Sequence, residues 1–320
     1  MRRILFIALV MVLAIQEART QNVTFNFSDG IDEGTLKTKV EKNISLFLTN
    51  INKASRQGAD DVDLNGVMMM AQTKEAFDEL WKFQPFKCTD NDNWQSCIHT
   101  VTGYSVRGIP VIVTDKDTQE TPSMRELTIE INKLGQISGV FFALEQHDIN
   151  TILQSGTEVK ETRERSEILN FVERYRSYYD QKDIKSIEDI FTDDAIIITG
   201  TVGMKKTNEG GMMKTVKYDQ LNKQQYIDKL KKIFERRSYV KVKFNGIEVI
   251  RHPRRTDIYM VRLFQNWRTP GYEDNGYVTL LWQFPKNGGD PRIMVRTWQD
   301  ESIIKSDENQ LFNVTDFKIN

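Results

Sequence analysis

The stretch from Ser166 to Gly200 constrains the fold more than any other part of the sequence. It begins with apolar residues that recur at three- and four-residue steps and so share one helix face: Ile168, Phe171, Val172, Tyr175 and Tyr179. Ser166 stands where an N-cap is expected. A shorter helical pattern follows, and β-branched residues then predict a buried strand that ends at Gly200. A long helix, a short helix and a strand therefore open one lobe.

Length and charge limit the classes of protein that the chain can represent. The 320 residues allow about two domains of roughly 150 residues each. The 44 basic and 45 acidic residues give a net charge of −1, which argues against a nucleic-acid binder because that class needs a basic surplus. We expect an N-terminal α+β lobe over residues 21–155, a second lobe over 156–305 and a polar tail over 306–320.

Residues 1–20 have the pattern of a signal peptide. Arg2 and Arg3 precede an apolar run from Ile4 to Ile15, and small residues around Ala18 follow. The run is shorter than the ~20 residues that span a bilayer, and no later segment qualifies. Because the only cysteines, Cys88 and Cys97, lie far beyond the run, no lipid attachment is expected. The sequence therefore predicts a secreted protein, periplasmic or extracellular, without a membrane span.

Two cysteines, Cys88 and Cys97, bracket a polar loop and are the only ones in the chain. In an oxidising compartment we expect them to form a disulfide, which would close a short loop and stabilise the fold by ~2–3 kcal/mol. The alternative is two unrelated thiols. Their spacing is wider than that of a CxxC redox motif.

A calcium-loop pattern lies between two helical segments of the first half. Asp61, Asp63, Asn65 and Gly66 match positions one, three, five and six of the pattern. Gln72 occupies position twelve, where the pattern needs a bidentate carboxylate. The alternative is a plain helix-to-helix connection, since Asp, Asn and Gly are common in turns. No other cofactor is expected.

The first half reads as helices followed by an antiparallel meander. The apolar periodicity predicts a helix from Asp32 to Gln57, with Gly58 as its C-terminal stop, and a second helix from Thr73 to Trp81. Alternating apolar residues between 98 and 144 then predict strands.

The second half continues from the opening stretch in a similar order. Thr201 to Tyr218 is predicted to be a mobile flap, and Asn222 to Arg237 a helix with a basic outer face. Four strands are expected to close the lobe: Tyr239 to Arg251, Thr256 to Trp267, Tyr277 to Phe284 and Ile293 to Gln299.

This order of elements resembles the nuclear transport factor 2-like superfamily. The resemblance is carried by ILNFVERYRSYYDQKDIKSIEDIFTDDAIIITG, YMVRLFQNW, GYVTLLWQF and IMVRTWQ, and it covers about Ser166 to Asp300. It implies an α+β fold in which helices close a bent sheet into a cystatin-like cone. With VRGIPVIV in the first half, the chain also resembles exported two-lobe proteins of the Bacteroidetes. Each lobe is expected to pack helices on a curved antiparallel sheet, and the first lobe is either a diverged cone or a different α+β unit.

The resemblance also implies an interior pocket and a set of residues that line it. Enzymes of the superfamily, such as steroid isomerases and scytalone dehydratase, use an aspartate or histidine as base and tyrosines to polarise a carbonyl. The candidate pocket residues are Tyr175, Tyr179, Asp194, Arg262, Gln265, Trp267, Trp282, Arg296 and Trp298. The alternative is that the aromatic residues among them fill the core.

Three functional hypotheses follow. The preferred one is a non-catalytic binding or assembly module that holds a small apolar ligand or a protein partner, because the second half has few acid–base groups. The second is a lyase or isomerase that acts on a small carbonyl compound through an Asp or Tyr of the cone. The third is a calcium-dependent structural protein. Cones of this kind often dimerise through the outer sheet face, so a homodimer is among the expected partners.

Overall fold

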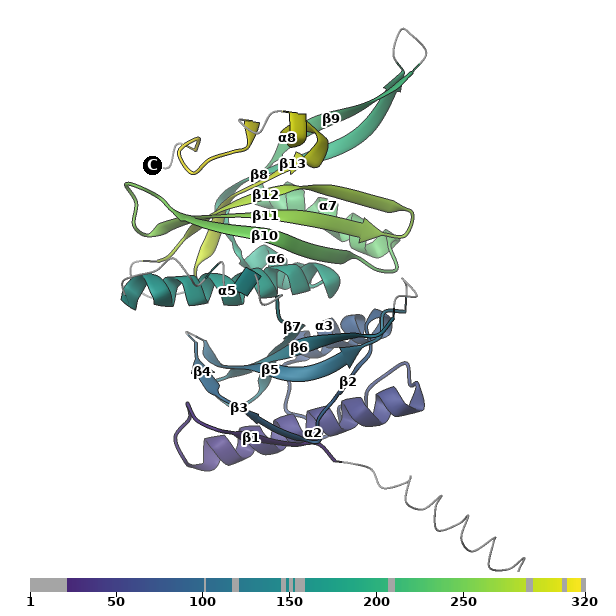
Figure 1. Ribbon diagram of the computed structural model, residues 1–320, viewed down its shortest axis with the longest axis vertical. Helices are drawn as coiled ribbons and strands as arrows, with labels where there is room; N and C mark the ends of the chain where they lie inside the picture. Colours follow the sequence, from purple (N-terminus) through teal and green to yellow (C-terminus); the bar gives the residue numbers. More distant parts are fainter. Residues whose placement is uncertain are drawn as a thin grey trace, which may run out of the picture. The chain divides into compact units, whose positions relative to one another are not determined.

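The computed structural model describes residues 22–100, 102–116, 121–144, 148–149, 152, 159–206, 211–285, 290–306 and 310–317. The chain divides into two compact units, residues 1–140 and 141–320, and each combines helices with a β-sheet (Figure 1). The predicted α+β class is therefore confirmed. The signal-peptide pattern lies outside the described residues. None of the helices described is long and apolar enough to cross a membrane.

The first unit packs two helices on a sheet. Helices α2 (Thr35–Gln57) and α3 (Ala71–Phe83) form as the apolar periodicity predicts, and the stripe of α2 from Val40 to Ile51 is buried. Gly58 ends α2 in the left-handed conformation at φ 59°, which favours glycine. The five-stranded sheet has the order β2-β5-β6-β7, and β4 pairs with β5, while β1 and β3 pair separately. The strand bounds are β1 Thr24–Phe27, β2 Phe86–Cys88, β3 Asp92–Gln95, β4 Cys97–His99, β5 Gly103–Val113, β6 Ser123–Asn132 and β7 Ile137–Phe142.

The expected disulfide is a wrong prediction, because both cysteines are free and buried. Cys88 pairs with Val111 of β5 and Cys97 pairs with Val106 of the same strand. With ~3.3 Å per residue along β5, and one residue lost to a bulge, the two backbones lie roughly 13 Å apart, well beyond the reach of a disulfide. Burial raises the pKa of the Cys88 thiol to about 12 and that of the Cys97 thiol to about 11.

The calcium-loop segment connects α2 to α3, and its three candidate ligands Asp61, Asp63 and Asn65 are exposed. The Asp63 side chain accepts a hydrogen bond from the Asn65 backbone N–H at 3.0 Å, which is the local bond of an Asx turn. Asn50 donates to the Asp63 carbonyl at 2.7 Å and so ties the turn to α2. Over the described ranges, no group of three or more His, Cys, Asp or Glu side chains is arranged to hold a metal ion.

The second unit has one six-stranded sheet with the order β10-β11-β12-β13-β8-β9. Neighbouring strands are antiparallel except β13 and β8, which are parallel. The strand bounds are β8 Phe191–Lys206, β9 Met212–Leu221, β10 Lys241–Arg251, β11 Ile258–Thr269, β12 Tyr272–Gln283 and β13 Arg292–Asp300. The helices are α5 Val159–Asp180, α6 Ile184–Asp189, α7 Lys223–Arg236 and α8 Glu301–Ser306.

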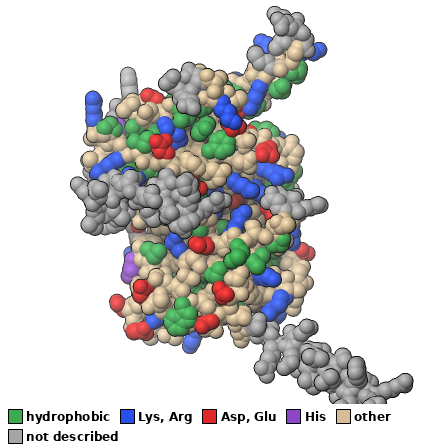
Figure 2. All heavy atoms as spheres, in the orientation of Figure 1, with side chains coloured by type: hydrophobic (Ala, Val, Ile, Leu, Met, Phe, Trp, Pro, Cys, Tyr) green, Lys and Arg blue, Asp and Glu red, His purple; other side chains and the backbone are tan. Residues whose placement is uncertain are grey.

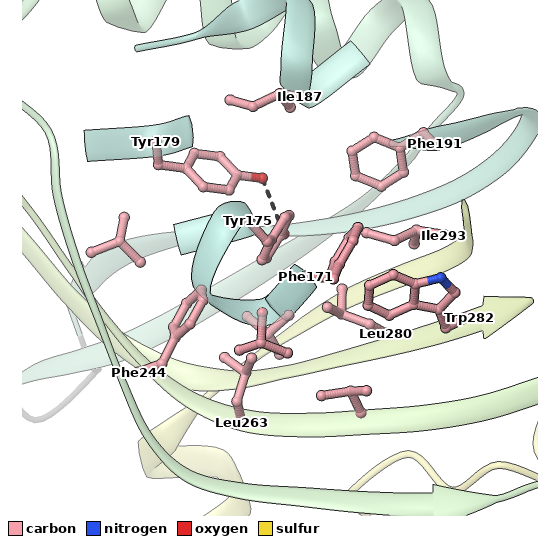
Figure 3. Packing of buried hydrophobic residues seen from close by; sticks show 14 of the residues in the cluster. Phe171, Tyr175, Tyr179, Ile187, Phe191, Phe244, Leu263, Leu280, Trp282 and Ile293 are labelled. Carbon is pink, nitrogen blue, oxygen red and sulfur yellow. Dashed lines mark hydrogen bonds between the residues drawn. The ribbon is translucent and has the colours of Figure 1, made fainter. Parts of the chain in front are cut away.

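Helices α5, α6 and α7 cover one face of this curved sheet, which we call the inner face (Figure 1). The predicted stripe of α5 is buried there, together with Leu263 of β11 and Leu280 of β12. Rings from the helices and the sheet interlock, among them those of Phe171, Tyr175 and Trp282 (Figure 3). The helices-on-curved-sheet arrangement expected for the second half is therefore present.

The opposite, outer face of the sheet is covered in part by the end of the chain. Val314 is buried against Met260, Leu281 and Val295. Arg262 donates from Nη2 to the Phe312 carbonyl at 2.6 Å. A dimer through this part of the outer face would have to displace residues 312–314.

The segment predicted as a flap is instead the continuation of two strands. β8 runs on to Lys206 and β9 begins at Met212, and the two pair in unbroken register from Ile197 with Leu221 to Lys206 with Met212. Val202 and Val216 are the ribbon residues that pack partly against the core. The remaining residues are mostly Lys, Thr and Met, so the alternating apolar pattern used to predict strands gave little signal here.

Candidate functional site

A cluster of three tyrosines and one arginine lies on the inner face of the second unit. Tyr175 and Tyr179 are one helical turn apart on α5 and therefore point the same way, and both are fully buried. Tyr226 comes from α7 and Arg296 from β13. We call these four residues the tyrosine–arginine cluster.

The hydroxyl groups of the cluster form a directed chain of hydrogen bonds. Tyr179 donates to the Tyr175 oxygen at 3.0 Å (Figure 3). Because a hydroxyl has one hydrogen, the 2.7 Å bond between Tyr226 and Tyr179 must be donated by Tyr226. Arg296 donates from Nε to the Tyr175 oxygen at 2.9 Å. Tyr175 therefore accepts twice, and its own hydrogen has no acceptor among the described residues.

Arg296 is a buried cation without a carboxylate partner among the described residues. Its side chain is only 5% exposed, and its guanidinium lies over the Tyr226 ring at 5.3 Å. Burial lowers the pKa of Arg296, but the three tyrosine hydroxyls raise it, and the net direction is upward. The guanidinium is therefore charged. Its one hydrogen bond within the described chain uses Nε, so the Nη donors remain available.

Two buried acceptor atoms on the same face lack a donor among the described residues. Gln265 is 3% exposed and its Oε1 is unpartnered. Asp274 has a second unpartnered oxygen, Oδ1, while Tyr272 donates to its Oδ2 at 2.7 Å. Burial raises the pKa of the Asp274 carboxyl, against an opposing effect of the nearby Arg296 charge. The Arg296 charge therefore acts on the Asp274 carboxyl, although the two side chains do not form an ion pair.

Strand register explains why these groups share one region. Gln265 of β11 lies opposite Phe244 of β10 and Gly276 of β12. The Phe244 ring stacks on Tyr175 at 5.8 Å between ring centroids. On β12, Asp274 is two residues from Gly276 and therefore points to the same face. Arg296 of β13 lies opposite Leu280, four residues along β12 from Gly276. The donors of the cluster and the two acceptors therefore share the inner face, and the Arg296 charge reaches Asp274.

Trp298 lies on β13, two residues after Arg296 and therefore on the same face, and its ring packs against two glycines. A Cβ atom at Gly200 of β8 would lie 2.2 Å from the Trp298 ring, and one at Gly276 would lie 2.7 Å from it. Only glycine at these two positions leaves room for the indole. Its 4% exposure shows that the ring is packed between strands.

The structure places seven of the nine predicted pocket residues on the inner face: Tyr175, Tyr179, Gln265, Trp267, Trp282, Arg296 and Trp298. The other two lie elsewhere. Asp194 is exposed on β8. Arg262 pairs with Glu248 at 2.6 Å and bonds the chain end. Trp282, with its side chain fully buried, is part of the hydrophobic core.

Sequence reasoning missed Tyr226 and Asp274 as members of the site. Tyr226 shares the three- and four-residue spacing of Leu230 and Ile233 on the apolar face of α7, and this spacing was the available signal. Asp274 falls in a run of turn-forming residues, but the turn itself consists of Pro270 and Gly271, whose φ is 72°, and β12 already begins at Tyr272. The carboxylate is therefore on a strand and faces inward.

Comparisons with solved structures give matches that cover part of the chain. No protein-family model and no curated protein matches the sequence. Bd1075 of Bdellovibrio bacteriovorus is 12% identical, with 64% of this chain and 76% of that chain covered and a TM-score of 0.34. A nuclear transport factor 2-like protein of Cytophaga hutchinsonii is 11% identical, with 42% and 97% covered and a TM-score of 0.31. A putative scytalone dehydratase of Novosphingobium aromaticivorans is 12% identical, with 43% and 84% covered and a TM-score of 0.32.

Proposed function

We propose that the second unit is a non-catalytic binding module for a small, mainly apolar molecule that carries one hydroxyl or carbonyl oxygen. The observation that supports this proposal most is the coexistence of spare donors and orphan acceptors in one buried region. Arg296 and Tyr175 offer hydrogens there, and Gln265 and Asp274 offer unpartnered oxygens.

The energetic cost of this arrangement supports a ligand. A buried polar group without a partner costs about 1–3 kcal/mol, and native proteins retain few of them. A buried guanidinium without a carboxylate costs more. Apolar side chains of similar size would avoid both costs. A ligand oxygen that accepts from Arg296 and Tyr175, and a ligand hydroxyl hydrogen that reaches Gln265 or Asp274, would remove them.

The placement of the acid–base candidates favours binding over catalysis. The hydroxyl of Tyr179 is fully used within the cluster, and Asp194 is exposed. Burial raises the pKa of Tyr179 well above its ordinary value and that of Tyr226 to about 12. Both stay protonated at neutral pH and act as donors that orient Tyr175.

We extend the proposal to location. The Arg2-Arg3 pair followed by the apolar run from Ile4 to Ile15 supports export of the chain to the periplasm or the medium. Detection of a mature N-terminus near residue 20 in the exported fraction would test this point, and an intact Met1 in the cytosol would contradict it.

The binding proposal is tested with 2-naphthol and naphthalene, an apolar pair that differs by one hydroxyl group. Calorimetric titration of the full chain should give at least tenfold tighter binding of 2-naphthol, since one charge-assisted hydrogen bond contributes about 1.5–3 kcal/mol. Arg296→Met and Gln265→Leu should each reduce the affinity for 2-naphthol toward that for naphthalene. Arg262→Met, a change on the outer face, is the matched control and should leave both affinities unchanged.

Two outcomes would overturn the proposal. One is equal affinity of the native chain for the two probes, and the other is the absence of saturable binding. Far-ultraviolet circular dichroism of each variant confirms folding. Gln265→Leu keeps the test valid if Arg296→Met fails to fold, because the buried Gln265 amide oxygen accepts no hydrogen bond from the described residues.

A second candidate function is an isomerase or lyase in which Asp274 acts as the base on a small carbonyl compound. The upward pKa shift of Asp274 and its unpartnered oxygen support it. Deuterium exchange next to the carbonyl of a cyclic enone, followed by nuclear magnetic resonance, tests it. Exchange that is catalysed by the native chain and lost in Asp274→Asn would establish this function, and no exchange above the solvent rate would end it.

A further inference from the structure

The two strands at the edge of the second sheet continue beyond it as a ribbon. β8 pairs with β13 only as far as Ile197, whereas its pairing with β9 runs on to Lys206. In Figure 1 this ribbon extends away from the rest of the second sheet. We call residues 201–206 and 212–217 the arm.

The base of the arm is fixed to the sheet. Lys214 of β9 forms an ion pair with Asp300 at 2.7 Å, and the Asp300 side chain is fully buried. Trp298 packs at Gly200, the residue before the arm, and Val216 of the arm lies close to the same glycine. The hydrogen bonds and the ion pair lower the pKa of Asp300 despite the opposing effect of burial, so this anchor stays charged at neutral pH. The arm is therefore held in a defined direction.

The arm exposes apolar and basic side chains together. Met204 is 60% exposed and Met212 is 58% exposed. Lys205 and Lys206 are exposed, and neither forms an ion pair with any residue that the structure describes. Residues 201–206 and 212–217 contain four lysines and no acidic residue. Blue and green side chains accordingly lie side by side along the arm in Figure 2.

Strand register places the two methionines next to each other. Met204 lies opposite Lys214, and Met212 lies opposite Lys206, so all four side chains share one face of the ribbon. Met204 and Met212 are then diagonal neighbours, roughly 7 Å apart. The result is a pair of flexible apolar side chains with the ammonium group of Lys206, unpaired among the described residues, beside it, while Lys205 lies on the opposite face of the ribbon.

We propose that the arm docks on the surface of a bilayer that contains anionic phospholipids. Methionine side chains can enter the boundary between headgroups and acyl chains, while lysines neutralise lipid phosphates. A nucleic acid fits less well, because the arm offers no aromatic ring for stacking and the chain carries a net charge of −1. An acidic protein would pair with the lysines but would need a matching apolar pocket for the methionines. This proposal does not depend on the ligand of the inner face.

Sedimentation with lipid vesicles tests the proposal. The full chain should bind vesicles of phosphatidylcholine with phosphatidylglycerol and not vesicles of phosphatidylcholine alone, and added salt should weaken the binding. The double variant Lys205→Glu, Lys206→Glu should bind more weakly by a factor of at least about 30, because two attractive lysines are lost and two repelling carboxylates are added. Met204→Ser with Met212→Ser should also weaken binding, with little effect of salt on the difference.

The matched control is the double variant Lys231→Glu, Lys232→Glu on α7, which changes the net charge equally at another exposed lysine pair. It should retain most of the binding. Equal loss in the control would show nonspecific charge attraction and would overturn the proposal. Equal binding to both kinds of vesicle, or none, would also overturn it. Binding of poly-L-glutamate with the same dependence on Lys205 and Lys206 would assign the arm to an acidic protein partner instead.

Discussion

Replacement of Tyr179 by phenylalanine tests the directed hydrogen-bond chain of the second unit. The change deletes one oxygen atom from a fully buried position. It removes the donation to Tyr175, worth about 1 kcal/mol, and it leaves the buried Tyr226 hydroxyl without an acceptor, at about 1–3 kcal/mol. We therefore expect Tyr179→Phe to lower the free energy of unfolding by about 2–4 kcal/mol.

The order of two related variants makes this prediction specific. Tyr226→Phe removes only the terminal donor and leaves the bond from Tyr179 to Tyr175 intact, so it should cost about 1 kcal/mol. Tyr277→Phe is the control, because its partly exposed hydroxyl forms no hydrogen bond with any described residue. It should change stability by less than about 0.5 kcal/mol.

Urea unfolding followed by tryptophan fluorescence measures these differences. Three of the five tryptophans, Trp267, Trp282 and Trp298, belong to the second unit and report on its unfolding. The reasoning is refuted if Tyr226→Phe costs as much as Tyr179→Phe, because the direction of donation would then be wrong. It is also refuted if Tyr179→Phe costs no more than the control.

Three further predictions follow from the same structure. Gly200→Ala should destabilise by about 1–3 kcal/mol, because its Cβ would overlap the Trp298 ring, whereas Gly203→Ala on the same strand should be nearly neutral; thermal unfolding of the pair checks this. Both thiols should react with a thiol reagent only after unfolding, without prior reduction, and titration of fewer than two would contradict the free cysteines. Asp274→Asn should stabilise the chain at neutral pH. Burial raises the folded-state pKa of this carboxyl, so its ionisation destabilises the fold above that pKa. The stability gained by Asp274→Asn should vanish below the unfolded-state pKa near ~4. A stability gain that grows on acidification would contradict this direction of the pKa shift.

Apolar periodicity was sufficient to predict the helices that carry the site. The stripe of α5 is spaced so that only one face can be buried, and Tyr175 and Tyr179 lie on that face as predicted. Gly58 likewise marks the end of α2, because a left-handed residue is needed there. These features depend on local geometry, which the sequence contains directly.

Features that depend on strand register could not be obtained in this way. The loop between Cys88 and Cys97 suggested a disulfide, but their distance is set by where each pairs along β5. The partnership of Arg296 with Tyr175 joins residues 121 positions apart in the sequence. The inward direction of Asp274 depends on where β12 begins. One sequence contains no signal for such long-range pairing.

The central claim is that the inner face holds a ligand oxygen between Arg296 and the orphan acceptors. A crystal structure of the protein soaked with 2-naphthol tests it most directly. The naphthol oxygen should lie within hydrogen-bond distance of an Arg296 Nη atom or the Tyr175 hydroxyl, with Gln265 or Asp274 accepting its hydrogen. Naphthol bound away from this face, or a face in which protein side chains already satisfy both acceptors, would contradict it.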